Sequence, residues 1–304
     1  MYQKKKTSWR NVKPFLLVLP GVLFVILFHY VPLWGWVYGF YQYKPGRALA
    51  DCQFVGFKNI TDLFGNAVMV RNVVRVMRNT LAIKGIGYLF SPLPMLFAVF
   101  LSEIRSKKFQ KGVQTLTTLP HFISWVIMYS LATAIFGSDG ALNHILVGMG
   151  LEPIGNILHS KDNVWITQVL LQEWKGLGWS SIVYFAAIAG LDMQLYEAAS
   201  IDGANKMQRI WYITLPQMIP TYFVLLVMSI GQFLNSGIDQ YLNFGNALNK
   251  EYIEVLDLYV YNIGIGSGLI SYSVAVGILK SIIAVILFAS ANWLSKKVRG
   301  TSVF

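Results

Sequence analysis

Long runs of apolar residues alternate with short polar segments along most of this chain. Apolar runs of about 18 or more residues are long enough to cross the hydrocarbon core of a bilayer as helices. We therefore expect an all-α integral membrane protein. The pattern predicts six transmembrane helices, with approximate bounds of 14–40, 79–102, 114–137, 164–190, 217–237 and 271–294.

The composition supports this fold class. Only 13% of the 304 residues are charged and 55% are hydrophobic, whereas about 25% of the residues in a typical soluble domain are charged. The first apolar run continues from Pro14 to about Tyr41, which is too long for the core of a signal peptide, so we expect an uncleaved first helix. The single cysteine, Cys52, excludes an internal disulfide framework.

Basic side chains cluster next to the ends of the predicted helices. They precede the first helix, separate the second from the third, and follow the last: Lys4, Lys5, Lys6, Arg10 and Lys13; Arg105, Lys107, Lys108 and Lys111; Lys296, Lys297 and Arg299. Such clusters mark cytoplasmic loops, so both termini are predicted to be cytoplasmic. The net charge of +11 does not indicate nucleic-acid binding, because no soluble region interleaves a basic face with stacking aromatics.

Three arginines oppose this charge rule. Arg71, Arg75 and Arg78 lie at the external end of the second predicted helix, at spacings of four and three. That spacing predicts an amphipathic helix at the outer interface, with long side chains that reach the lipid headgroups.

A polar, alanine-rich segment interrupts the apolar pattern on the predicted cytoplasmic side: "LYEAASIDGANKMQRIWYITLP", residues 195–216. Glu197, Ala198 and Ala199 favour a helix. Gly203 is expected to end it, because glycine adopts the left-handed cap conformation at low cost. Small side chains let the backbone of a partner approach closely, and a carboxylate offers a site for a partner's arginine. From these residues alone, a protein contact and an amphipathic loop lying on the membrane are equally consistent.

The spacing within this segment decides between the two. Three residues separate the Glu-Ala-Ala triplet from Gly203, and nine more precede Ile213-x-Leu215-Pro216. This pattern resembles the EAA signature of transmembrane subunits of binding-protein-dependent ABC importers, and "YEAASIDGA" resembles their carbohydrate-importer branch. Four further phrases resemble the branch that imports complex oligosaccharides or polysaccharide fragments: "FLLVLPGVLFVILFHYVPLWG", "FVGFKNITDLF", "RNTL" and "TLPHFISWV".

The resemblance implies the type I ABC importer permease fold, in which a cytoplasmic coupling helix sits in a cleft of an ATPase. The implied organisation is a cytoplasmic basic segment (1–13), a six-helix permease domain (14–294) containing the coupling loop (about 191–216), and a cytoplasmic tail (295–304). The residues implied to contact the ATPase are Glu197, Ala198, Ala199, Asp202, Gly203 and Met207. The implied partners are a second homologous permease, two ATPase subunits, an extracytoplasmic solute-binding protein and an oligosaccharide, in a bacterial inner membrane.

The chain lacks the motifs of a nucleotide or metal site. No G-x-x-x-x-G-K-[ST] occurs in the sequence, so ATP phosphates are not held here by that route. We therefore expect ATP and Mg²⁺ on the separate ATPase, and neither a cofactor nor an enzymatic activity in this chain. The four histidines show no metal-ligand spacing, and nothing resembles a placed catalytic triad.

Polar and aromatic residues inside the predicted helices are the candidates for a solute pathway. Sugars pack their C–H faces on aromatic rings and hydrogen-bond through their hydroxyls, and charged residues at membrane depth usually face a cavity. Gln232, Asn235 and Asp239 step by three and four and predict one polar stripe on the fifth helix. The other candidates are Trp125 and Tyr129 in the third helix, and Gln172, Glu173, Trp174, Lys175, Trp179 and Tyr184 in the fourth. For any one of them, the alternative is a helix–helix hydrogen bond or a side chain reaching the interface.

The charges within the predicted helices bear on the cargo. Lys84 and Lys280 are also embedded in apolar sequence. An excess of lysines would suit an anionic saccharide, such as a uronate oligomer like those of alginate or pectin, whereas Glu173 argues against it. Two rival functions stay open. A gradient-driven secondary sugar transporter would leave the EAA segment unexplained, and a membrane enzyme acting on lipid-linked glycans predicts paired carboxylates or a metal cluster that the sequence does not contain.

Overall fold

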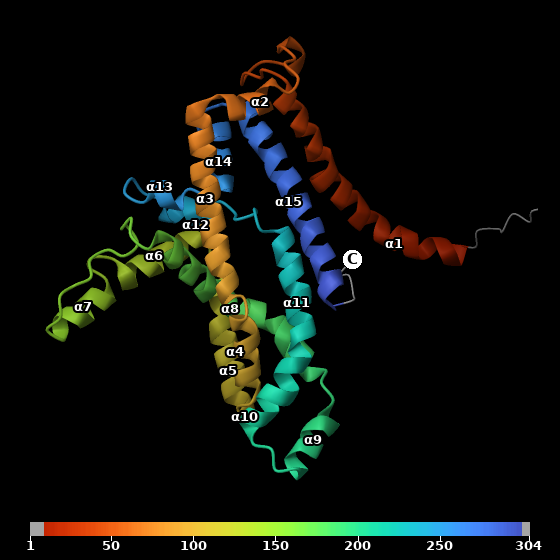
Figure 1. The fold of residues 1–304 in the computed structure, drawn as a ribbon, viewed down its shortest axis with the longest axis vertical. Helices are drawn as coiled ribbons and strands as arrows, with labels where there is room; N and C mark the ends of the chain where they lie inside the picture. Colours follow the sequence, from red (N-terminus) through yellow and green to blue (C-terminus); the bar gives the residue numbers. More distant parts are fainter. Residues whose placement is uncertain (1–8, 300–304) are drawn as a thin grey trace, which may run out of the picture. The chain divides into compact units, whose positions relative to one another are not determined.

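The computed structural model describes residues 9–299. Within this range the regular structure is helical, and the one β pairing is an isolated bridge between Tyr41 and Phe54 (Figure 1). The predicted all-α class is therefore confirmed. The first eight residues of the predicted N-terminal segment (1–13), with Lys4, Lys5 and Lys6, lie outside the described residues, as do positions 300–304 of the predicted tail (295–304).

The chain divides into two compact units. The first unit comprises the chain up to Ala67 together with Val260–Leu279. Its elements are α1 (Trp9–Val25), η1 (Ile26–Tyr30), η2 (Val31–Phe40), η3 (Leu49–Asp51), α2 (Lys58–Gly65), η6 (Asn262–Gly266) and the N-terminal part of α15 (Ile270–Arg299). Gly39 of η2 packs so closely on α15 that an added Cβ would lie 3.1 Å from Cγ1 of Val274. Asn59 closes the following turn by donating to the carbonyls of Gly39 and Tyr41.

The second unit comprises Val68–Tyr259 and the chain from Lys280. Its elements are α3 (Ala67–Phe90), α4 (Leu93–Ser102), α5 (Lys107–Thr118), η4 (Leu119–Phe122), α6 (Trp125–Phe136), α7 (Ala141–Gly148), α8 (Val164–Ala189), α9 (Met193–Ile201), α10 (Lys206–Arg209), η5 (Ile210–Thr214), α11 (Leu215–Gly231), α12 (Asp239–Phe244), α13 (Lys250–Ile253), α14 (Leu256–Tyr261) and the rest of α15.

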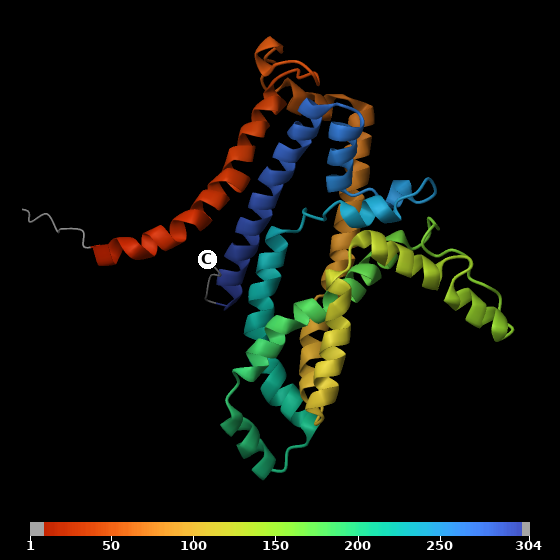
Figure 2. The ribbon, with the colours of Figure 1, turned by 180° about the vertical axis from the view of Figure 1, so that it is seen from behind.

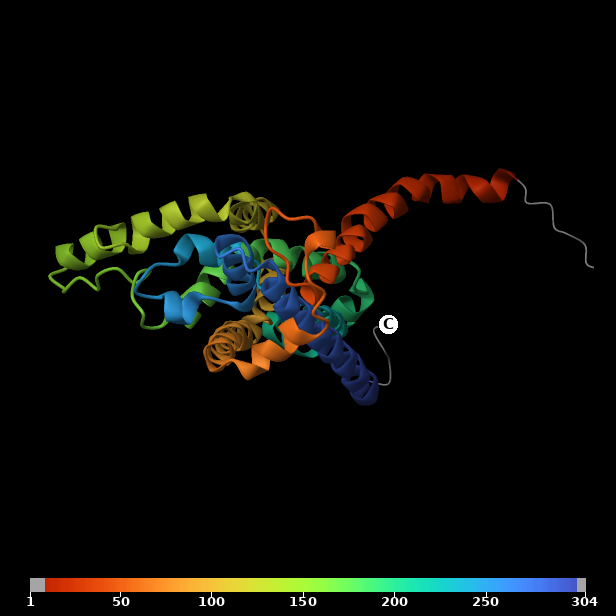
Figure 3. The same ribbon diagram turned by 90° about the horizontal axis from the view of Figure 1, so that it is seen from above.

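Helix α8 is the centre of the second unit. Helices α4 and α5 pack along it, as Figures 1 and 2 both show. Gly178 of α8 has no room for a side chain, because an added Cβ would lie 2.3 Å from the carbonyl oxygen of Thr117. At the other end of α8, α12 packs against α6, and the view from above shows the two side by side (Figure 3).

Five helices within residues 9–299 are long and apolar enough to span a membrane, and a bent pair makes a sixth. The five are Pro14–Phe40, Ala67–Ser102, Trp125–Gly148, Lys206–Gly231 and Ile270–Trp293, and the pair is Val164–Ala189 with Met193–Ile201, bent by 71°. The predicted count of six agrees with this upper figure. The second span starts at residue 67, earlier than the predicted 79.

The third predicted helix (114–137) is wrong as one continuous helix. The chain forms α5, a short 3-10 turn in η4, and then α6. Pro120 lies at the start of η4 and lacks the N–H that would continue the helical ladder. Ser124 then caps α6 by accepting from the N–H of Ile127 at 3.4 Å.

The predicted polar stripe on the fifth helix is also wrong. Helix α11 ends at Gly231, residues 232–238 are not helical, and Asp239 begins a separate helix, α12. Gly237 adopts a positive φ of 75°, which residues with side chains rarely adopt. Gln232, Asn235 and Asp239 therefore do not share one helix face.

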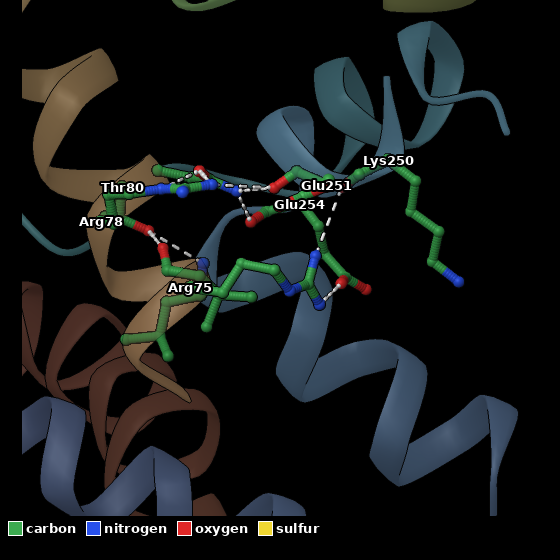
Figure 4. Close-up of polar contacts among 9 residues, drawn as sticks. Arg75, Arg78, Thr80, Lys250, Glu251 and Glu254 are labelled. Atoms are coloured by element: carbon green, nitrogen blue, oxygen red, sulfur yellow. Dashed lines mark hydrogen bonds and ion pairs between the residues drawn. The ribbon is translucent and has the colours of Figure 1, made fainter. Parts of the chain in front are cut away.

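A polar cluster ties the N-terminal half of α3 to α13 and α14 (Figure 4). Arg75 forms an ion pair with Glu254 at 2.5 Å. Arg78 donates to the carbonyl of Glu251 at 3.4 Å and lies over the rings of Trp165 and Tyr252. Both guanidinium groups thus have partners within the protein, and the predicted reach of these side chains to lipid headgroups stays a prediction.

Asn79 and Thr80 are the fully buried members of this cluster. The side-chain amide of Asn79 donates to the carbonyls of Glu251 at 2.8 Å and Glu254 at 3.0 Å. Next to it, the buried hydroxyl of Thr80 accepts from the N–H of Leu256 at 2.9 Å. Buried carbonyls need such partners, so α3 determines where the loop between α12 and α14 lies.

We expect Asn79→Ala to lower the free energy of unfolding by about 2–4 kcal/mol, because two buried carbonyls lose their donors. The measurement is the melting temperature of the purified protein in detergent. Arg71→Ala is the matched control, since Arg71 lies on the same helix with an exposed side chain, and it should melt as the wild type does. Equal melting temperatures for the two variants would contradict the role assigned to Asn79.

Candidate functional site

A cavity of about 520 Å³ lies in the second unit between α3, α8 and α11. Five of the predicted pathway residues line it: Gln172, Glu173, Trp179, Tyr184 and Gln232. Four of these belong to α8 and recur on one helix face, so the helical period of α8 turns them toward the same space. Gln172 is held in place by donating to the hydroxyl of the buried Tyr241 at 2.9 Å.

The opposite walls carry polar residues that were not among the predicted site residues. Lys84, Tyr88 and Ser91 come from α3 and the turn that follows it, and Tyr222 comes from α11. The hydroxyls of Ser91 and Tyr222 lie 2.9 Å apart and link these two walls. A signal was present in the sequence, because Lys84, Tyr88 and Ser91 step by four and three within an apolar run.

Glu173 and Trp179 give the α8 wall its charge and its aromatic surface. Glu173 is half-buried, and among residues 9–299 no hydrogen-bond or ion-pair partner is found for its carboxylate. The ring of Trp179 is 46% exposed and stacks on His121 with 4.4 Å between ring centroids. An acceptor and a flat apolar face are the two features that bind sugar hydroxyls and sugar rings.

Lys175 lies on α8 but does not line this cavity. Its ammonium donates to the carbonyls of Pro120 at 3.0 Å, His121 at 2.7 Å and Ile123 at 2.5 Å. These carbonyls lie at the break between α5 and α6, where the helical ladder is interrupted. A lysine has three N–H donors, so the ammonium is fully used in closing the break.

The remaining predicted pathway residues lie away from the lining of this cavity. The rings of Trp125, Tyr129 and Trp174 pack against the buried core of the second unit, and Tyr129 also bonds His159 at 3.0 Å. Asn235 donates to Gln232 at 3.0 Å. The side chain of Asp239 is exposed at the start of α12.

The predicted coupling segment forms a separate helix. Asp192 caps α9 by accepting from the N–H of Gln194 at 2.9 Å. Gly203 has a φ of 78°, the left-handed conformation expected of it. Asn205 and Gln208 then form a capping box that begins α10. Figures 1 and 2 show α9 beyond the ends of α8 and α11.

The surface of α9 and the turn after it is exposed and partly apolar. Ile201 is 87% exposed and Met193 is 65% exposed. Of the predicted coupling residues, Glu197, Ala198, Asp202, Gly203 and Met207 are exposed and Ala199 is half-buried. The hydroxyl of Tyr196 anchors the helix on Thr214 at 2.9 Å. Apolar side chains gathered on a polar segment are typical of a surface that binds another protein.

Comparisons with known proteins agree with this arrangement. The model of a family described as binding-protein-dependent transport system inner membrane component matches residues 91–300. Protein LplB of Bacillus subtilis (strain 168) is 36% identical over 297 residues, which cover 96% of this chain and 90% of that protein. The polygalacturonan/rhamnogalacturonan transport system permease protein YteP of the same strain is 40% identical over 287 residues, covering 93% and 87%.

A solved structure matches the whole fold. It is a crystal structure of a bacterial alginate ABC transporter in complex with an alginate pentasaccharide-bound periplasmic protein. One chain of it superposes with a TM-score of 0.84 at 31% sequence identity, covering 98% of this chain and 100% of that chain. The predicted type I ABC importer permease fold is confirmed by these matches.

We expect Lys175→Met to lower the free energy of unfolding by about 3 kcal/mol, because three carbonyls at the helix break lose their donor. The melting temperature in detergent reports this loss. Lys111→Met on α5 removes the same charge from an exposed position and should leave the melting temperature unchanged. A Lys175→Met protein as stable as the control would show that the ammonium does not close the break.

Proposed function

This chain belongs to the family of binding-protein-dependent transport system inner membrane components, and on that premise we propose that it forms one side of the translocation pathway of an ATP-driven oligosaccharide importer. The proposal rests on the positions of α8 and α11, which line the cavity and are connected in the chain through α9. Both helices line the polar, aromatic cavity. The exposed helix α9 lies between them in the chain, three residues after α8 and shortly before α11.

The proposed contact with the ATPase is the exposed surface of α9 and the turn at Gly203. Its members are Glu197, Ala198, Ala199, Asp202, Gly203 and Met207, as the EAA signature implies. Small residues let α9 approach a partner closely, and Glu197 offers a carboxylate to a basic side chain. Support comes from the exposed apolar residues beside it, which a partner would cover.

The mechanism follows from how α9 is connected. ATP and Mg²⁺ belong to the two ATPase subunits, and this chain contributes the movement of its own helices. When the ATPase pair closes, α9 moves with it and displaces the ends of α8 and α11, which changes the cavity between them. A ligand shifts such an equilibrium only through its different affinities for the two states. The loaded solute-binding protein must therefore prefer the outward-facing state.

The proposed cargo is an acidic oligosaccharide. Two of the similar proteins carry names of polymers that contain sugar acids, polygalacturonan/rhamnogalacturonan and alginate. The cavity offers Trp179 for ring faces, Glu173 for hydroxyls and Lys84 for a carboxylate. A second homologous permease would supply the opposite side of the path, and a solute-binding protein would deliver the sugar from outside the membrane.

The proposed membrane topology puts both termini in the cytoplasm of a bacterium. The basic cluster in the first turns of α5, which includes Lys107, Lys108 and Lys111, then lies on the cytoplasmic side together with α9, in agreement with the charge rule. The broad outer loops around α7 and α13 would face the solute-binding protein.

Uptake into proteoliposomes separates this function from a gradient-driven transporter. The vesicles contain the permease pair and the ATPase subunits, with ATP inside and the loaded binding protein outside. We expect uptake to require ATP and to persist after ionophores dissipate the proton and sodium gradients. Uptake without ATP that stops with the ionophores would identify the gradient-driven alternative.

We expect Ala198→Arg to abolish uptake while the protein still assembles in the membrane, because a long charged side chain would block the close approach of the ATPase to α9. The readout is ATP-driven uptake, with membrane content measured alongside. Ala198→Ser keeps the position small and should transport as the wild type does. Normal uptake by Ala198→Arg would place the contact elsewhere.

A further inference from the structure

Three lysines lie at membrane depth in the second unit, and only one of them is neither used up by backbone carbonyls nor paired with a carboxylate. Resting on the function proposed above, we propose that Lys84 binds a carboxylate of the sugar and sets the preference of the cavity for acidic over neutral oligosaccharides.

Lys175 is not available to bind a sugar carboxylate, because contacts within the protein use its donors. Its three donors are taken by the carbonyls of Pro120, His121 and Ile123. It also lies 5.5 Å from the centroid of the Trp125 ring. The charge of Lys175 therefore stabilises the break between α5 and α6 and is not available to a solute.

Lys280 is not available to bind a sugar carboxylate, because it is already ion-paired with Asp257. One carboxylate oxygen of Asp257 accepts from Lys280, and the other accepts from the N–H groups of Ser236 at 2.7 Å and Gly237 at 3.1 Å. Both oxygens are thus occupied, and the charge of Lys280 is compensated. This pair holds the non-helical segment after α11 in place.

Lys84 remains partly unsatisfied. Its ammonium donates to the carbonyl of Asn235 at 3.0 Å, and among residues 9–299 no partner is found for its other two donors. Asp257 attracts Lys84 and is ion-paired with Lys280, so one carboxylate faces two ammonium groups and the formal charges of the three side chains leave a surplus of +1. Lys84 lines the cavity, so this surplus charge faces the solute.

An ammonium with two open donors in such a cavity binds a carboxylate more strongly than a neutral acceptor. Charge-assisted bonds to a carboxylate are shorter and about twice as strong as neutral ones, and the low dielectric of a membrane protein strengthens them further. Uncompensated charges at membrane depth are costly and usually serve a function. A sugar acid supplies the compensating carboxylate, and a neutral sugar does not.

The cavity also holds an acid, Glu173, on the wall opposite Lys84. Within residues 9–299, Glu173 and Lys84 do not form an ion pair, so the two charges do not cancel by contact. A carboxylate accepts hydrogen bonds from hydroxyls, which every sugar ring presents. Glu173 therefore contributes to binding any oligosaccharide, while Lys84 discriminates between acidic and neutral ones.

The test measures direct binding to the assembled importer in detergent without the solute-binding protein, because that protein would impose its own selection. The probes are a labelled uronate trisaccharide and a neutral trisaccharide of the same length. Lys84→Gln is the main variant, since its amide can still donate to the carbonyl of Asn235. We expect it to weaken binding of the uronate on the order of tenfold and to leave binding of the neutral sugar unchanged.

Three further variants make the outcome specific. Lys84→Arg keeps the cation and should retain the preference, and Lys111→Gln removes an exposed charge and should change nothing. Glu173→Gln should weaken both sugars equally. Stimulation of ATP hydrolysis by the loaded binding protein checks that each variant is folded and assembled.

Each result decides one question. A Lys84→Gln importer that keeps the wild-type ratio of uronate to neutral binding would overturn the role of Lys84, as would equal losses for both sugars. If Lys84→Gln fails to assemble, loss of the preference in the assembled Lys84→Arg importer overturns the proposal and its retention supports it. A wild-type importer that neither binds nor takes up any oligosaccharide would refute the proposed function instead.

Discussion

A membrane offers no water to satisfy backbone polar groups, so every break in a spanning helix must be closed by the protein itself. This constraint accounts for the unusual features of the second unit. The break between α5 and α6 is closed by the ammonium of Lys175. The segment after α11 is closed by the carboxylate of Asp257, which accepts two backbone N–H groups and is compensated by Lys280. The embedded charges that suggest a solute pathway in the sequence are thus largely used to stabilise breaks, and only the remainder is free to bind a solute.

The breaks and the cavity are connected through α8. One face of this helix lines the cavity with Glu173, Trp179 and Tyr184, and a neighbouring face carries Lys175 to the break. Gly178 lets α5 approach α8 closely. The stacking of His121 on Trp179 brings a residue from the break to the edge of the cavity. A movement of α8 would therefore change both the cavity and the geometry of the third span, which suits a pathway that opens alternately to two sides.

The sequence predicted the helices whose ends carry local signals. The bounds of the fourth helix (164–190) agree with α8 (Val164–Ala189), and Gly203 adopts the left-handed conformation that its position indicated. The errors arose where the deciding partner is distant in the chain. Lys175 lies 55 residues from the Pro120 carbonyl that it stabilises, and Arg75 lies 179 residues from Glu254. The polar and aromatic residues of the fourth predicted helix included Gln172, Glu173, Trp179 and Tyr184, which line the cavity. The sequence does not show that Lys84 keeps open donors while Lys175 does not, because the difference is in how many donors other segments use.

The central claim is that α9 lies between the two helices that line the cavity, so that moving α9 moves the cavity walls. Spin labels at Val183 on α8 and Leu226 on α11, in a protein with Cys52→Ser, report the distance across the cavity by double electron–electron resonance. The measurement compares the assembled importer without nucleotide and with ATP trapped in the ATPase pair. The account predicts a shifted distance distribution when ATP is trapped. The same distribution in both states, in an importer that transports normally, would contradict it.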